Sequence, residues 1–192
     1  MSARDAGSNL RLFFALWPSA DMQAELAMAA APAIHAAGGR PIPQGNLHAT
    51  LAFLGSVPRA SFEALGAIAS NVAASWRAGD SSREPPIVLR LDGTEYWRRA
   101  GILVAHASPV PQAAIDLAQT LKQSLVTAGF APDLKPFRAH VTLARKVQRA
   151  RDAAMSPVTW SFDGFALVAS QTAPSGSSYS VVRTWALDER CS

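Results

Sequence analysis

A short pattern occurs twice in this chain, almost half a sequence apart. Positions 47–51 are Leu-His-Ala-Thr-Leu and positions 139–143 are Ala-His-Val-Thr-Leu, with the two histidines 92 residues apart in a chain of 192. Self-similarity at a fixed spacing is typical of an internally repeated fold. We therefore expect a duplicated lobe with a pseudo-two-fold axis, and the two motif strands side by side in one sheet or cleft.

Each motif predicts one reactive face and one packed face, because successive strand residues point to opposite sides of a sheet. His48 and Thr50 project together, as do His140 and Thr142, while the apolar residues between them face a core. Near neutral pH one imidazole accepts a proton while another donates one. Hydroxyls hold the non-bridging oxygens of a phosphate. The paired motifs thus favour in-line cleavage of a P–O bond.

Basic residues flank the second motif. Arg138 precedes His140 by two residues and shares its face, whereas Arg145 follows by five. Strand alternation turns Arg145 the other way, so we expect it just past the strand end, curling back to the phosphate. Arg145, Lys146, Arg149 and Arg151 form either an RNA-tracking cluster or a solvated face. The 18 Lys and Arg against 14 Asp and Glu give a net charge of +4, which favours an anionic partner.

The remaining pattern predicts an α+β fold in a single domain over 1–192, with lobes at roughly 1–80 and 81–192 and with exchange of strands between them allowed. The expected order is β-α-β-α-β-β-α-β-β-β. Helices are expected at 21–37 (capped by Ser19, with Pro32 a break or kink), 60–76 and 111–128. Strands are expected at 10–17, 47–54, 87–91, 102–107, 139–145, 160–170 and 179–187, with a turn at 96–101 and loops at 40–46 and 77–86.

Composition excludes several classes of protein. An apolar content of 49% with 17% charged residues excludes global disorder. Cys191 has no partner for an intramolecular disulfide, which favours a reducing compartment. Since no run of about 18 apolar residues occurs, we expect a soluble, cytoplasmic protein that does not engage a membrane. We also expect a monomer.

The two motifs and their flanks resemble the 2H phosphoesterases, and within them the bacterial RNA 2′,3′-cyclic phosphodiesterases once named 2′-5′ RNA ligases. The resemblance rests on Asn-Leu-His-Ala-Thr-Leu-Ala-Phe-Leu-Gly at 46–55 and Phe-Arg-Ala-His-Val-Thr-Leu-Ala-Arg at 137–145. Softer matches lie at 11–16, in the strand before Pro109 and at 174–179. The chain departs from the family at Ala139, where relatives commonly carry proline.

The resemblance implies two pseudo-symmetric lobes whose antiparallel sheets line a central cleft, with helices outside. It implies that His48 donates a proton to the leaving 3′-oxygen and that His140 accepts one from water. Thr50, Thr142 and Arg145 would bind the cyclic phosphate of an RNA end or nucleotide. The implied product is a 2′-phosphomonoester, formed without metal or other cofactor. Arg138 stays a further substrate-binding candidate from its position on the strand.

Other interpretations remain open. The motif threonines are also good strand formers, and His35 and His106 have no motif around them. The histidines alternatively bind zinc, although no Cys cluster or HExxH accompanies them. Tyr96 and Trp97 beside two arginines form a base-stacking patch or an ordinary turn. A non-catalytic module for nucleotides or RNA ends, and 2′-5′ ligation as the main direction, are the alternative functions.

Overall fold

The computed structural model describes residues 9–78, 87–147, 155–173 and 176–188. Within them, nine strands form one sheet of order β7-β4-β5-β6-β3-β1-β8-β9, with β2 pairing to β6, and every pairing is antiparallel. The strands are β1 (Asn9–Leu16), β2 (Arg40–Pro41), β3 (Ala49–Pro58), β4 (Ile87–Trp97), β5 (Ile102–Ala107), β6 (His140–Arg145), β7 (Val158–Phe162), β8 (Gly164–Ala173) and β9 (Gly176–Ala186). The helices are α1 (Ala20–Ala37), α2 (Phe62–Arg77) and α3 (Gln112–Thr127).

The two motif strands meet at the centre of the sheet. β3 and β6 are antiparallel neighbours joined at one residue pair, Ala49 with Val141, the middle residues of the two His-x-Thr patterns. An antiparallel register centred on that pair sets His48 across from Thr142, and Thr50 across from His140. The expected α+β fold, with the equivalent strands side by side, is therefore confirmed.

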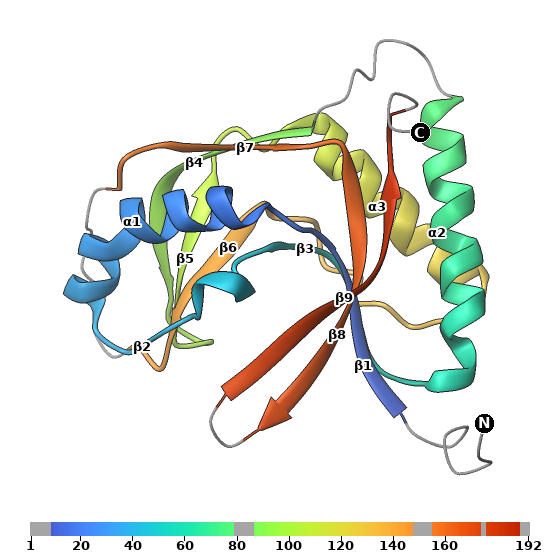
Figure 1. The fold of residues 1–192 in the computed structure, drawn as a ribbon, viewed down its shortest axis with the longest axis horizontal. Coiled ribbons are helices and arrows are strands. Elements are labelled where there is room, and N and C mark those ends of the chain that lie inside the picture. Colours follow the sequence, from blue (N-terminus) through green and yellow to red (C-terminus); the bar gives the residue numbers. More distant parts are fainter. Residues whose placement is uncertain (1–8, 79–86, 148–154, 174–175, 189–192) are drawn as a thin grey trace.

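The helices lie on different parts of the sheet (Figure 1). α1 packs on β5, β6 and β7, whereas α2 and α3 pack on each other and on β9 and β3. β1 and β3 share one half of the sheet with the C-terminal strands β8 and β9. Each half thus combines distant parts of the chain, and the division into lobes at roughly 1–80 and 81–192 stays a prediction.

A β-bulge occurs at the same place in both motif strands. In β3, Leu51 is the extra residue between the pairs that Thr50 and Ala52 form with β1. In β6, Leu143 is the extra residue between the pairs that Thr142 and Ala144 form with β5. A bulge shifts the alternation of side chains by one residue, so the third residue after each threonine, Phe53 in β3 and Arg145 in β6, returns to the threonine's face.

This bulge corrects the expectation for Arg145. Alternation had placed it past the strand end, but it is the last residue of β6 and pairs with Ile102. The bulge, which leaves Leu143 and Ala144 both buried, brings Arg145 to the face of Thr142.

Several element boundaries also differ from the sequence prediction. The expected strand over 160–170 is two strands, β7 and β8, separated at Asp163 and paired with different neighbours. β3 continues through Gly55, whose φ of 72° accommodates an irregular register, and β4 extends through Trp97. Ser19 caps α1 as expected, and Pro32 lies inside α1 without ending it. Most of the predicted 77–86 loop, together with Arg149 and Arg151, lies outside the described residues.

The main core lies between the sheet and the helices. It includes the fully buried side chains of Leu12, Phe14 and Trp160, and the Trp160 indole N–H donates to the Met22 carbonyl across 2.9 Å. A second, smaller cluster, which includes Phe13, covers the other face of β1 and β8. None of the described helices is long and apolar enough to cross a membrane.

Gly39 fixes the connection that leads into β2, beside the end of β6. Its φ is 100°, and an added Cβ would lie 2.7 Å from the Arg145 carbonyl oxygen, whereas at Gly38, with a φ of 66°, an added Cβ would meet nothing within 4 Å. We expect Gly38→Ala to cost about 1–3 kcal/mol from backbone strain, and Gly39→Ala at least about 1 kcal/mol more from the added collision. Chemical denaturation of both variants measures the difference, and equal destabilisation would contradict this account.

Candidate active site

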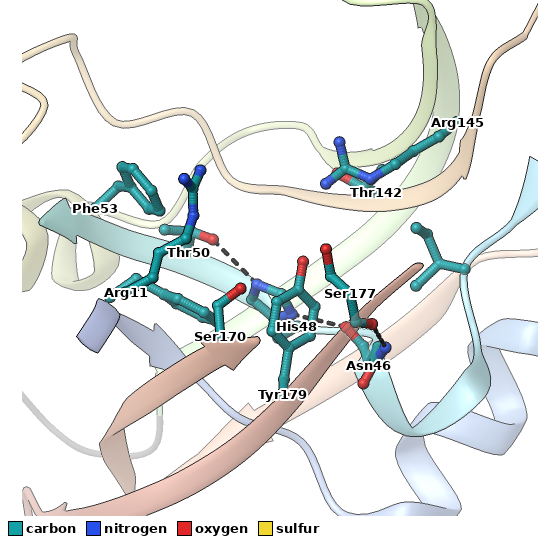
Figure 2. Close-up of a pocket in the computed structure, with 12 residues that line it drawn as sticks. Arg11, Asn46, His48, Thr50, Phe53, Thr142, Arg145, Ser170, Ser177 and Tyr179 are labelled. Atoms are coloured by element: carbon teal, nitrogen blue, oxygen red, sulfur yellow. Dashed lines mark hydrogen bonds between the residues drawn. The ribbon is translucent and has the colours of Figure 1, made fainter. Parts of the chain in front are cut away.

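A cavity of about 400 Å³ lies over the centre of the sheet (Figure 2). Its volume falls within the usual range for small-molecule sites, about 300–1,000 Å³. The lining combines imidazole, hydroxyl, amide, aromatic and guanidinium groups, which suits a polar anionic ligand with an aromatic portion. The lining residues are Arg11, Phe13, Ile42, Asn46, His48, Thr50, Phe53, Thr142, Arg145, Ser170, Ser177 and Tyr179.

Four of the six predicted site residues line this cavity. His48 immediately precedes β3, and Thr50 lies within β3 on the same face as His48. Thr142 and Arg145 belong to β6. Figure 2 shows Thr50 on one side of His48, and Thr142 with Arg145 on the other. The structure thus brings groups from two distant motifs to one anion-sized space.

The other two predicted residues, His140 and Arg138, are not among the described residues that line the cavity. The His140 ring lies against Trp97, with ring centroids 4.4 Å apart. The Arg138 guanidinium lies over the Trp97 ring at 4.7 Å and forms an ion pair with Glu95 at 2.8 Å. His140 nevertheless shares the face of Thr142, and its charge is one of the causes that lower the pKa of His48.

Backbone carbonyls set the same tautomer in both motif histidines. Nδ1 of His48 lies 2.7 Å from the Asn46 carbonyl oxygen, and Nδ1 of His140 lies 2.7 Å from the Arg138 carbonyl oxygen. A carbonyl oxygen only accepts, so Nδ1 carries the hydrogen in each ring. The Nε2 atom of each neutral ring is then left as a proton acceptor, and for His48 it lies 3.2 Å from the Thr50 hydroxyl.

Three aromatic rings surround His48. Trp17 and Phe13 stack on the imidazole with centroids 5.3 and 4.8 Å away, and Tyr179 meets it edge-on at 5.2 Å. Burial among these groups is the largest cause that lowers the pKa of His48 from 6.5 to about 4, and the charges of His140 and Arg145 act in the same direction. The free site therefore holds His48 neutral at neutral pH.

His140 has a different electrostatic environment. Burial is again the main cause that lowers its pKa and Arg138 adds to the effect, but the Glu95 carboxylate opposes them. The pKa of Glu95 is itself lowered, first by the Trp97 indole N–H and then by Arg138. The Trp97 N–H is buried without a hydrogen bond of normal geometry, so its influence on Glu95 reflects proximity rather than a well-formed bond.

Residues that sequence reasoning did not assign to the site complete the cavity. The Asn46 side chain donates to the Ser177 carbonyl oxygen across 2.9 Å and so ties the first motif to β9. Arg11, Phe53 and Ser170 line one end of the cavity. The sequence did carry a signal for Arg11: it lies two residues from Phe13 on the same strand, so the two side chains were expected on one face.

Tyr96 and Trp97, which the sequence suggested as one aromatic patch, are neighbouring residues of a strand, so their side chains point to opposite faces. Tyr96 and Trp97 are the last residues of β4 rather than turn residues, and the Tyr96 hydroxyl donates to the Val147 carbonyl oxygen across 3.1 Å. His106 pairs with His140 across β5 and β6, and an added Cβ at Gly93 would lie 2.6 Å from the His106 Nε2. Trp97 therefore belongs to the surroundings of the site, because its ring contacts His140.

Among the residues that the structure describes, no group of three or more His, Cys, Asp or Glu is placed to hold a metal ion.

Comparison with known proteins gives a consistent result. The family model described as the 2′-5′ RNA ligase superfamily matches residues 18–173. Two proteins called RNA 2′,3′-cyclic phosphodiesterase, from Escherichia coli and Thermus thermophilus, are each 30% identical to this chain. The alignments cover 93% of this chain in both cases, with 97% of the first relative and 90% of the second.

Solved structures agree with these sequence matches. Escherichia coli LigT complexed with 3′-AMP superposes with a TM-score of 0.79 at 28% identity, over 95% of this chain and all of that one. A Thermus thermophilus structure gives a TM-score of 0.74 at 29% identity, over 93% of this chain and 98% of that one. The phosphodiesterase domain of the ns2 protein of MHV, at 12% identity and a TM-score of 0.60, shares the fold.

The low pKa of His48 is directly measurable. We expect its NMR titration in the free protein to have a midpoint near pH 4, and inorganic phosphate to raise that midpoint because a nearby anion favours the charged imidazole. A His48→Gln variant assigns the resonance. A midpoint at or above 6.5 in the free protein, or no response to phosphate, would contradict the described environment.

Proposed function

The chain belongs to the 2′-5′ RNA ligase superfamily, and on that premise we propose that its cavity hydrolyses 2′,3′-cyclic phosphates at RNA ends to 2′-phosphomonoesters. The observation that carries this proposal is the antiparallel meeting of two His-x-Thr strands at Ala49 and Val141. Relatives named RNA 2′,3′-cyclic phosphodiesterase support the same substrate and the same reaction.

The reaction needs a base and an acid on opposite sides of phosphorus. Water attacks the phosphorus and gives a proton to Nε2 of His140. The P–O3′ bond breaks, and the departing 3′-oxygen takes a proton from Nε2 of His48. The shared tautomer supports these roles, because each ring keeps its Nδ1 hydrogen on a backbone carbonyl and exchanges protons at Nε2.

The hydroxyls and Arg145 stabilise the charge that develops on phosphorus. Thr50 and Thr142 hold the two non-bridging oxygens, and Arg145 offsets their negative charge from the side of Thr142. Preorganised donors of this kind lower the barrier because they require no reorientation during the reaction. Arg138 is proposed to act from outside the cavity, where its carbonyl orients His140.

The negative charge of the substrate explains how His48 can act as an acid despite its low pKa in the free site. His48 is neutral in the free site, but a bound phosphodiester anion replaces part of the lost solvation and favours the imidazolium. The donor is therefore generated by binding of its own substrate.

Ligation uses the same groups in the same roles. The family description names a 2′-5′ RNA ligase, and when an RNA 5′-hydroxyl attacks in place of water it gives its proton to His140, while the 3′-oxygen again leaves with a proton from His48, so that a 2′-5′ phosphodiester forms. The two reactions separate experimentally, because ligation requires a second RNA end and rises with its concentration whereas hydrolysis does not. We propose hydrolysis as the main direction, since water is always in excess.

We propose that the protein acts as a monomer, because the two motifs that the reaction needs pair with each other within one chain. We propose that it acts in the cytoplasm, where RNA is processed, and without a metal ion. Light scattering measures the molar mass in solution and so tests whether the protein is a monomer. Activity that EDTA abolishes and a divalent cation restores would overturn the metal-free mechanism.

Removal of either imidazole tests the mechanism. We expect His48→Ala and His140→Ala each to lower kcat on adenosine 2′,3′-cyclic phosphate by about 10²–10⁴-fold, measured as 2′-AMP formed. His35→Ala, on the exposed side of α1, is the matched control and should leave kcat unchanged. Near-normal turnover in either motif variant would rule out the paired roles, and binding without turnover by the unaltered protein would favour a binding module.

The same assignment fixes the pH dependence. kcat/KM requires His48 protonated and His140 neutral, and both pKa values are below 6.5. Above both values, the fraction of correctly protonated enzyme falls about tenfold for each pH unit. We expect an optimum of kcat/KM below pH 6.5 and a decline on its alkaline side. A flat profile up to pH 8 would be incompatible with the acid that we assign.

A further inference from the structure

We infer that the Arg11 end of the cavity is a second anion subsite, which binds the phosphodiester on the 5′ side of the terminal nucleotide. The preferred substrate is then an oligonucleotide that ends in a 2′,3′-cyclic phosphate, rather than a mononucleotide. This inference rests on the proposed function, because it assumes that the cyclic phosphate lies between the two motifs.

The duplicated bulge gives the cavity two distinct ends. Arg145 follows His140 by five residues, and the residue at the same place after His48 is Phe53. Both are brought to the cavity by the bulges in β3 and β6. One end thus carries a guanidinium of its own, whereas the corresponding position at the other end carries an aromatic ring.

Arg11 supplies the missing cation at that second end. Its guanidinium carbon lies 4.8 Å from the centre of the Phe53 ring, a cation–π contact that holds the charge in place. Figure 2 shows Arg11 beside Phe53 and Thr50, away from Arg145 and Thr142.

The register of β1 places Arg11 beyond the reacting phosphate. Phe13 stacks on His48, and Arg11 lies two residues further along the same face, about 7 Å away along the strand. Arg11 pairs with Ser170 of β8, which in turn pairs with Tyr179 of β9. A row of guanidinium, hydroxyl and phenol groups therefore crosses three adjacent strands and lines the cavity.

The two arginines differ in their surroundings. Arg145 acts on the reacting centre, since it is one of the groups that lower the pKa of His48. Arg11 is exposed, and its fixed position on Phe53 suits a solvated backbone phosphate entering the cavity from outside. A mononucleoside cyclic phosphate has one anionic group and leaves this end unused, whereas an oligonucleotide fills both.

The test compares two substrates: adenosine 2′,3′-cyclic phosphate and the dinucleotide ApA with a terminal 2′,3′-cyclic phosphate. We expect Arg11→Gln to lower kcat/KM on the dinucleotide by about 10- to 100-fold, the range for a lost charge-assisted hydrogen bond, and to lower the mononucleotide value much less. Arg59→Gln removes an exposed arginine that does not line the cavity and should change neither value.

Salt dependence provides a second readout. For the dinucleotide, the slope of log kcat/KM against log salt concentration should become shallower by about 0.7 in Arg11→Gln, as expected for one lost phosphate contact on a single strand. Equal losses on both substrates would place Arg11 at the reacting phosphate and overturn the inference, as would no loss on either. Absence of turnover by the unaltered enzyme on both substrates would instead refute the proposed function.

Discussion

The site depends on one short contact, the pairing of Ala49 with Val141 where the two motif strands meet. Because the strands are antiparallel, this contact sets each motif threonine opposite the histidine of the other motif. The bulges at Leu51 and Leu143 then bring Phe53 and Arg145 back to the same face. The cavity thus follows from the packing of small and apolar residues behind it.

The two halves of the site are alike in backbone and different in surroundings. His48 lies among the rings of Phe13, Trp17 and Tyr179, while His140 lies against Trp97 beside the Glu95–Arg138 ion pair. A reaction that needs one acid and one base gains from such inequality, because identical environments would give both imidazoles the same proton affinity. Internal duplication supplies the paired geometry, and the neighbouring strands make the pair unequal.

Much of this arrangement was predictable from local pattern. Strand alternation placed His48 with Thr50 and His140 with Thr142, and the repeat predicted that their strands would be neighbours. The bulges were not predictable, because Leu-Ala inside an apolar strand has no distinctive signal, and Arg145 was misplaced for that reason. The break at Asp163–Gly164 did leave a turn signal that was missed. The aromatic surroundings of His48 depend on pairing among β1, β3, β8 and β9, which local sequence does not encode.

The mechanism requires one phosphorus atom to lie between the two motifs. A crystal structure with the product 2′-AMP bound tests this requirement. We predict the phosphate oxygens within hydrogen-bond distance of the Thr50 and Thr142 hydroxyls, with an Nε2 atom of His48 on one side and of His140 on the other. A phosphate bound by one motif alone, or outside the cavity, would contradict this mechanism.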